Sequence, residues 1–505
     1  MDLGSHAARA NRASPSKRHE TPRVAILGAG ISGLVAAHEL SQSGLPVTLF
    51  ERSGRVGGRI QTFRFPGTEH LGELGAMRIP ASHVHTLRYI TKMRLDDRLS
   101  RFTTMFQGRS GLVAPGSLAG MPGPLLPTQD AGNELAGLVS QILMDKLKVV
   151  IDVLSPGEIR DVFHEYASGR LYSDLSTLLR TKVDPARFGF LLHAPLEEVV
   201  RLLQGLEEQM APSLRLFFRD ISWEVSADLF LLRGGLQQLP ERLAASLPHA
   251  VNFHSEIQRI FSHESFVELV IRDLESGTSR LERFDYVICT LPVPVLRKVL
   301  LEGFTHGKLE ALRKARYASA SKVLFLCKEK FWRRPPHDIR SGGTFAGNTS
   351  RQLYYNDIDL DEGSTGSGRG TLLASYTLGR DSEALAGLPD DEVVSLVRED
   401  IGRIHPEINE PGMVEAFKVR HWQKEEGFLG GCSVTWPIYY EDASPGDNVT
   451  RVWNEVARPD KRVYFAGEHC SDHRAWMEGA VTSSLKTVSA LLRDSQEAGA
   501  TAGAP

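Results

Sequence analysis

Residues 23–61, RVAILGAGISGLVAAHELSQSGLPVTLFERSGRVGGRIQ, decide the fold. The apolar run at 23–27 predicts a buried parallel strand. Gly28, Gly30 and Gly33 follow it with the G-x-G-x-x-G spacing. In this motif the first glycine permits a tight turn and the second lets the backbone approach a pyrophosphate. The third lets the next helix pack closely against the strand, so the spacing predicts a nucleotide-binding turn.

A helix and a second strand complete the unit. The helix is predicted from residue 31 to about residue 43, so its unpaired amides, with Ser32 in the first turn, would face the phosphates. The strand at 47–50 then brings in Glu51, whose carboxylate can accept both ribose hydroxyls. A glycine triad alone could be a tight turn without a ligand. The full order of strand, glycines, helix, strand and acid predicts an α/β chain with a Rossmann-like dinucleotide-binding domain.

A glycine pair flanked by arginines follows at residues 52–59, RSGRVGGR. Together with the glycine triad and Glu51, this run resembles the FAD fingerprint of the flavin-containing amine oxidase family. The resemblance implies a GR2-type flavoprotein with the amine-oxidase fold and FAD as cofactor. It places Arg52 and Gly58 against the cofactor and Arg59 near the pyrophosphate. A guanidinium fork suits two phosphate oxygens, although a Gly-rich surface loop is the alternative.

Length and composition set the outer limits. A chain of 505 residues is too long for one compact core, so two or three domains are expected. The net charge of −3 gives no reason to expect nucleic acid or an anionic membrane as a partner. The four cysteines form no C-x-x-C pair, and no apolar run is long enough to span a bilayer. We therefore expect a cytoplasmic protein without a membrane anchor, with a homodimer as a possible assembly.

The chain divides into segments of different character. We predict a disordered arm at 1–21, a discontinuous FAD-binding domain, a mixed α/β substrate-binding domain, and a helical subdomain at 131–231 that interrupts them. The FAD-binding domain would comprise 22–80, 232–300 and 455–495, and the substrate-binding domain 81–130 and 301–454.

Residues 71–80, LGELGAMRIP, carry the most specific resemblance. They are similar to the segment of the L-amino-acid oxidase branch that passes beside the flavin. The resemblance implies that Met77 contacts the flavin and that Arg78, also beside it, binds the α-carboxylate of the substrate. The chemistry agrees, because a permanently charged planar fork matches a carboxylate. Amine and polyamine oxidases have no such need, and an exposed arginine before Pro80 is the alternative.

The substrate-binding domain supplies two further candidates. Lys322 matches the family lysine that holds a water against flavin N5. A buried lysine is costly without a partner, although one that reaches solvent from a strand end is the alternative. Tyr376, in TLLASYTLG, matches the tyrosine that gives the carboxylate a second hydrogen bond, with Tyr354 and Tyr355 as weaker candidates. A tyrosine packed in the core would explain the same pattern.

Three more contacts follow from the same resemblance. The backbone of Ile257 would contact adenine, and Trp422 would lie near the flavin. Cys432 follows a glycine pair at the place where monoamine oxidases bond their flavin covalently. The amino-acid oxidase branch generally lacks this bond, and the spacing from Trp422 follows that branch.

The stretch at 463–491 resembles the family's closing motif. Gly467 and Glu468 would meet the ribityl or pyrophosphate region, and Trp476 would form an aromatic wall beside the substrate. The amide of Met477, at a helix N-terminus, would favour negative charge at flavin N1 and O2. Several potential metal ligands lie near Glu468, but their close spacing inside an FAD motif gives no reason to expect a metal.

These observations together predict oxidative deamination of an L-amino acid. Hydride would leave Cα for flavin N5, and the imino acid would hydrolyse to a 2-oxo acid and ammonia while O2 becomes hydrogen peroxide. Alternatives on the same fold are an amine or polyamine oxidase, an amino-acid 2-monooxygenase and a non-catalytic flavoprotein. The side chain of the substrate stays open.

Overall fold

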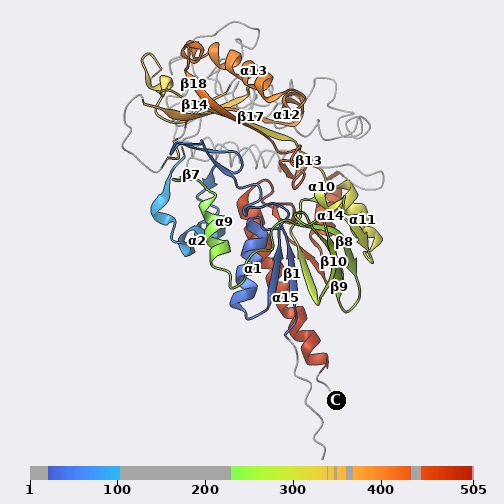
Figure 1. Ribbon diagram of the computed structural model, residues 1–505. Helices are drawn as coiled ribbons and strands as arrows, with labels where there is room; N and C mark the ends of the chain where they lie inside the picture. Colours follow the sequence, from blue (N-terminus) through green and yellow to red (C-terminus); the bar gives the residue numbers. More distant parts are fainter. Residues whose placement is uncertain are drawn as a thin grey trace, which may run out of the picture.

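The computed structural model describes residues 21–102, 229–337, 339–345, 350–355, 357–359, 368–433 and 445–502 (Figure 1). The predicted arm at 1–21 lies outside these residues except for its last position. The predicted helical subdomain at 131–231 also lies outside them, except for residues 229–231, which belong to strand β7 (Leu229–Leu232).

A four-stranded parallel sheet forms the centre of the nucleotide-binding part. Its strands lie in the order β2-β1-β11-β20. They are β1 (Val24–Leu27), β2 (Val47–Phe50), β11 (Tyr286–Cys289) and β20 (Val463–Phe465). Every residue of β1 is buried, as expected for a central strand covered on both faces. The Rossmann-like sheet predicted from the glycine motif is thereby confirmed.

Helices α1 (Ile31–Gln42) and α15 (Met477–Ala502) lie side by side on one face of this sheet (Figure 1). The Ser32 hydroxyl oxygen lies 2.6 Å from that of Ser484, which joins the two helices near their N-terminal ends. Helix α9 (Gln238–Ala245) packs on α1. The helices cover the sheet with a continuous apolar core, so the N-terminal and C-terminal parts of the chain fold as one layer.

A mixed sheet covers the other face, with strands in the order β10-β9-β8-β12, in which only β12 runs parallel to its neighbour β8. The strands are β8 (Ser255–Ser262), β9 (Val267–Asp273), β10 (Ser279–Phe284) and β12 (Leu300–Glu302). The strand predicted at 251–260 begins later, because Asn252 forms an isolated bridge to Phe50 and His254 has a φ of 54°. Helices α10 (Val293–Leu296), α11 (His306–Lys314) and α14 (Pro445–Ala457) complete this layer.

A five-stranded antiparallel sheet forms the second body of the fold, in the order β15-β16-β17-β14-β18. The strands are β14 (Ala320–Cys327), β15 (Gly343–Phe345), β16 (Gln352–Tyr354), β17 (Gly370–Leu378) and β18 (Val414–His421). Helices α12 (Gly379–Ala386) and α13 (Asp390–Gly402) pack on it. Figure 1 shows this body at the end of the molecule opposite the C-terminus of α15.

Several short elements complete the described part of the fold. They are β3 (Thr62–Arg64) with β4 (Leu71–Glu73), β5 (Ile79–Pro80) and β6 (Leu99–Arg101) on either side of β7, β13 (Tyr317–Ala318) with β19 (Cys432–Ser433), and α2 (Val84–Lys92). The 3-10 turns are η1 (Asp96–Arg98), η3 (Phe331–Arg333), η4 (Pro406–Asn409) and η5 (Glu468–Cys470). Among the described helices, none combines the length and the apolar character that a bilayer span requires.

Candidate active site

One cavity of about 580 Å³ is lined by residues of both bodies. Its wall includes the turn after β1, the end of β2 and the start of β8 from the nucleotide-binding part. Strands β14 and β17 contribute Lys322 and Tyr376, and Trp422 and Trp476 lie on the same wall. The site therefore opens beyond the carboxyl ends of the parallel strands, where α/β sheets bind their ligands.

The three motif glycines have different roles in the geometry. Gly28 has a φ of 102°, and its N–H donates to the Phe50 carbonyl at 2.8 Å. A Cβ on Gly33 would lie 1.9 Å from the Gly28 carbonyl oxygen, so Gly33 lies behind the cavity wall and serves the packing of α1. A Cβ on Gly30 would meet no protein atom within 4 Å. The second glycine thus faces open space, as close approach of a pyrophosphate requires.

Glu51 lies on the cavity wall with its carboxylate held in place. The Ala29 N–H donates to Oε2 at 2.8 Å, and the Ser53 N–H and hydroxyl donate to Oε1 at 2.9 and 2.8 Å. A carboxylate has about four lone-pair positions, so it can also accept hydrogen bonds from a ribose. Neighbouring Arg52 has acidic partners, since its Nε donates to Glu256 at 2.9 Å and its Nη2 pairs with Glu426.

Half-buried Arg59 and buried Glu468 form an ion pair on the wall. Arg59 Nη1 donates to Glu468 Oε1 and to the Gly431 carbonyl, both at 2.9 Å. Burial alone would raise the pKa of Glu468, but Arg59, His469 and hydrogen bonds that include the Ala475 N–H hold it at about 2. Glu468 is therefore ionised at neutral pH, and it fixes the Arg59 guanidinium at the cavity.

Lys322 lines the cavity and shares a buried environment with Glu73. Lys322 is 3% exposed, and its Nζ donates to the carbonyls of Gly75 at 2.6 Å and Glu73 at 3.3 Å. Burial lowers the pKa of Lys322, and the Arg78 charge lowers it further, whereas Glu73 opposes the shift. Burial also raises the pKa of Glu73, whose carboxylate accepts from the Leu236 N–H at 2.7 Å.

Arg78 lies just behind the cavity lining, and its side chain is surrounded by aromatic rings. It is 8% exposed, and its Nη1 donates to the Tyr354 hydroxyl at 3.2 Å. Its guanidinium carbon lies 5.7 Å from the centre of the Trp476 ring, 5.9 Å from Phe102 and 6.0 Å from Tyr354. The environment is desolvated, which strengthens any bond from Arg78 to an anion.

The structure places the three candidate tyrosines differently. The Tyr354 hydroxyl accepts a hydrogen bond from Arg78, and the role predicted for Tyr376 at the substrate carboxylate stays a prediction. The Tyr376 ring lines the cavity, and Lys322 Nζ lies 4.9 Å from its centre. Tyr355 belongs elsewhere, because its hydroxyl contacts Thr344 and His405 in the core of the five-stranded body.

The remaining predicted residues are placed as follows. Trp422 is buried on the wall, where its Nε1 donates to the Leu74 carbonyl at 2.9 Å. Met477 begins α15 at the cavity, whereas Met77 is buried and is not among the residues that line the cavity. Cys432 lies on the wall and forms no disulfide with another described cysteine. Further predicted residues that line the cavity are Ser32, Arg52, Gly58, Ile257, Gly467 and Trp476.

Sequence reasoning did not single out Glu73, Thr290 or Phe428, although all three belong to the site region. Glu73 stands inside the quoted run at 71–80, and its position facing Lys322 depends on two strands far apart in sequence. Thr290 follows directly after β11, at the carboxyl end of a parallel strand, and this position was a usable signal. Phe428 lines the cavity and packs on Trp422 with ring centres 5.1 Å apart.

Together the parallel sheet, the open face of Gly30 and the fixed carboxylate of Glu51 define a protein that binds an adenine dinucleotide. The profile of the family described as "Flavin containing amine oxidoreductase" matches residues 31–492. The chain belongs to this family, and FAD is its cofactor. It is thus an FAD-dependent amine or amino-acid oxidase, which acts on a small-molecule substrate with O2.

Relatives with known names agree with this assignment. The chain is 34% identical to the flavin-dependent L-tryptophan oxidase RebO of Lentzea aerocolonigenes, over 93% of this chain and 98% of that protein. It is 28% identical to the L-amino-acid oxidase of Mus musculus, over 92% of this chain and 70% of that protein. The structure of a putrescine oxidase bound to putrescine superposes with a TM-score of 0.65 at 18% identity, covering 94% and 99% of the two chains. That likeness shows the fold.

Proposed function

We propose that this chain is an L-amino-acid oxidase, which converts an L-amino acid to the 2-oxo acid with release of ammonia and hydrogen peroxide. The observation that carries the proposal is the buried guanidinium of Arg78 beside the cavity. When bound, FAD would supply the acceptor for the hydride of the substrate Cα and the route of the electrons to O2. The residues of this chain orient the substrate and supply the charges around it.

Electrostatics support an anionic substrate group at this place. Arg78 and Lys322 are both buried. The two groups lie close enough together that the charge of Arg78 lowers the pKa of Lys322. Glu73 opposes this effect and raises the pKa of Lys322. Burial raises the pKa of Glu73 itself, which favours the neutral form of its carboxyl group. Arg78 keeps its charge, and burial shifts both Lys322 and Glu73 toward their neutral forms, so the charge of Arg78 favours a carboxylate, which the substrate of an amine oxidase lacks.

Each residue then has a proposed role. Arg78 would bind the α-carboxylate, with Tyr354 fixing the guanidinium through its hydroxyl. Lys322 would hold or move a proton at Nζ beside the reacting carbon, because burial lowers its pKa. Tyr376 and Trp476 would line the substrate position and limit its orientation, and fixed geometry of this kind supplies much of the rate.

An aromatic side chain is the proposed preference of the site. Phe102, Tyr354 and Trp476 surround the carboxylate-binding arginine, and aromatic rings pack well against one another. The relative at 34% identity is an L-tryptophan oxidase, which supports the same choice.

The test is anaerobic mixing of the purified holoprotein with a substrate panel while flavin absorbance is followed. The panel pairs each L-amino acid with its decarboxylated amine, for example L-tryptophan with tryptamine, and includes the D-enantiomer. We expect rapid bleaching with L-tryptophan or another aromatic L-amino acid, and little with the amine or the D-enantiomer. Bleaching by the amines instead would overturn the proposal in favour of an amine oxidase.

A second readout separates the oxidase from a monooxygenase. After aerobic turnover, the products are analysed for the 2-oxo acid and for the amide that remains when carbon dioxide is lost. The proposal requires the 2-oxo acid, one hydrogen peroxide and one ammonia per substrate consumed. Formation of the amide without hydrogen peroxide would contradict it.

A further inference from the structure

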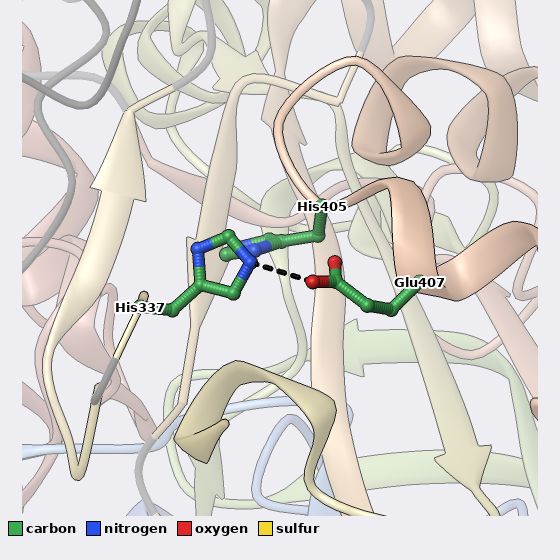
Figure 2. A group of neighbouring side chains, drawn as sticks. All are labelled: His337, His405 and Glu407. Carbon is green, nitrogen blue, oxygen red and sulfur yellow. Dashed lines mark hydrogen bonds and ion pairs between the residues drawn. The ribbon is translucent and has the colours of Figure 1, made fainter. Parts of the chain in front are cut away.

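Three potential metal ligands, His337, His405 and Glu407, meet inside the five-stranded body (Figure 2). Each offers a ligand atom, and these atoms lie within 4.8 Å of one another. His337 lies shortly after η3, whereas His405 and Glu407 lie where α13 connects to η4. None of the three is among the described residues that line the flavin cavity.

The polar atoms of this group are not all satisfied by the protein. His337 Nε2 lies 2.9 Å from Glu407 Oε1, and Figure 2 shows the imidazole and the carboxylate facing each other with the His405 ring beside them. His405 Nδ1 and Glu407 Oε2 are buried and have no hydrogen-bond partner within the part of the chain that the structure describes. Buried polar atoms without partners are costly, which indicates that a ligand is needed here.

A hydrogen bond with Tyr355 orients the His405 ring. Its Nε2 lies 2.7 Å from the Tyr355 hydroxyl, which itself lies 2.7 Å from Thr344 Oγ1. When the Tyr355 hydroxyl donates to Thr344, Nε2 of His405 carries the proton and donates to Tyr355. Nδ1 then presents a lone pair toward the cluster. Metal-ligating histidines are typically oriented in this way by a hydrogen bond at the other ring nitrogen.

We propose that His337, His405 and Glu407 bind one divalent transition-metal ion, with Zn²⁺ the best match. The ligand atoms would be His405 Nδ1, His337 Nε2 and the Glu407 carboxylate. Two imidazoles and one carboxylate are a common Zn²⁺ ligand set, and a water can fill the fourth position. Tetrahedral bonds of about 2.1 Å place ligand atoms ~3.4 Å apart, so small side-chain rotations would close the site.

The position of the cluster suggests what the ion does. His405 is fully buried, and the ring of His337 packs against it with centres 4.6 Å apart. The ion would tie the segment around His337 to η4 across the apolar core that also contains Tyr355. The side chain of Glu407 is 20% exposed, which gives the ion a path of entry. The ion would thus hold these two segments together, away from the flavin cavity.

The test uses the full-length holoprotein with FAD bound. It is dialysed against a chelator, then titrated with ZnCl2 by calorimetry, and bound zinc is counted by mass spectrometry. The wild type is compared with Glu407→Gln and His405→Gln. Glu410→Gln is the matched control, because Glu410 lies three positions further on, is half-exposed and pairs with Arg334 on the surface.

We expect one Zn²⁺ per chain for the wild type and for Glu410→Gln, with a higher melting temperature after zinc is added. Tyr355→Phe should weaken binding by about 10- to 100-fold, because it removes the hydrogen bond that orients His405. Glu407→Gln and His405→Gln should weaken it more than Tyr355→Phe does, with flavin absorbance unchanged in each.

Two outcomes would overturn the proposal. The first is equal zinc binding in the wild type, Glu407→Gln and His405→Gln, which would assign the zinc to surface histidines. The second is no zinc binding by the wild type, which would make the cluster a hydrogen-bonded core element. If the variants do not fold, Co²⁺ added to the wild type decides, because tetrahedral Co²⁺ absorbs at longer wavelength than the flavin. Absence of those bands would refute the site.

Discussion

Replacement of Arg78 by methionine tests the proposed carboxylate clamp most directly. Methionine keeps most of the length of the side chain and its contact with the rings of Phe102, Tyr354 and Trp476, but it removes the charge and the donor to Tyr354. Because Arg78 is 8% exposed, little water can replace the lost interaction. The variant should therefore fold and keep its yellow colour while losing substrate binding.

The size of the effect follows from the burial of the ion pair. Removal of one partner of a buried, hydrogen-bonded charge pair costs about 2–5 kcal/mol. Each ~1.4 kcal/mol is tenfold, so kcat/KM for an L-amino acid should fall by about 30- to 5,000-fold. Arg78→Lys, which keeps the charge but not the planar fork, should fall less.

The assay measures kcat/KM from hydrogen peroxide release for an L-amino acid and for its decarboxylated amine. The amine has no carboxylate, so its slow turnover should be nearly the same in wild type and Arg78→Met. Arg64→Gln is the control, since Arg64 pairs with Glu69 on an exposed hairpin. An equal loss for both substrates would show that Arg78 is only structural, and unchanged amino-acid turnover would remove the clamp.

Three further predictions concern the cofactor and the fold. Gly30→Ala should leave the apoprotein folded, because the added methyl meets no protein atom within 4 Å, but it should weaken FAD binding by about 1–3 kcal/mol. Gly33→Ala, whose methyl would lie 1.9 Å from the Gly28 oxygen, should not fold normally. Full FAD content in Gly30→Ala, measured by absorbance, would contradict the assignment. The pKa of Glu468 is lowered from 4.5 to about 2, so its stabilisation of the folded state is present above pH 4.5 and is lost as the pH falls toward 2. The stabilisation lost is roughly 3 kcal/mol. Acid titration followed by flavin fluorescence should show this loss in the wild type and not in Glu468→Gln. Lys308→Met should lower the free energy of unfolding by about 3 kcal/mol or more without changing flavin absorbance, because buried Lys308 donates to three carbonyls at the end of α14. Lys314→Met, at a surface pair with Glu310, should change the free energy of unfolding by less than about 1 kcal/mol. Similar melting temperatures for the two variants would count against this reasoning.

The sequence by itself determined the nucleotide-binding unit. The strand at β1, the turn at Gly28 and the helix at Ile31–Gln42 follow from local rules, since a glycine with positive φ and an apolar run are properties of neighbouring residues. Glu51 lies directly after β2 for the same reason. The start of α15 at Met477 was likewise predictable, because the A-G-E run and the helix that follows form one continuous motif.

Only the tertiary structure decided where Tyr354 and Tyr376 lie relative to the cavity. Tyr354 and Tyr376 lie on neighbouring strands, β16 and β17, and the register between them shifts from Gln352 to Tyr354. A shift of one residue turns a side chain to the other face of the sheet, and no spacing in the sequence records it. Residue type alone therefore could not give the positions of the two side chains.

The same limit applies to the contacts between distant segments. Glu73 acts on Lys322 only because β4 and β14 converge at the cavity, and His337 meets His405 and Glu407 only because η4 packs beside the segment after η3. Sequence patterns report periodicity and local geometry, whereas these groups depend on packing between elements that the chain brings together from far apart. For that reason the cofactor motif was readable from the sequence, and the charge balance around Arg78 and the His-His-Glu cluster were not.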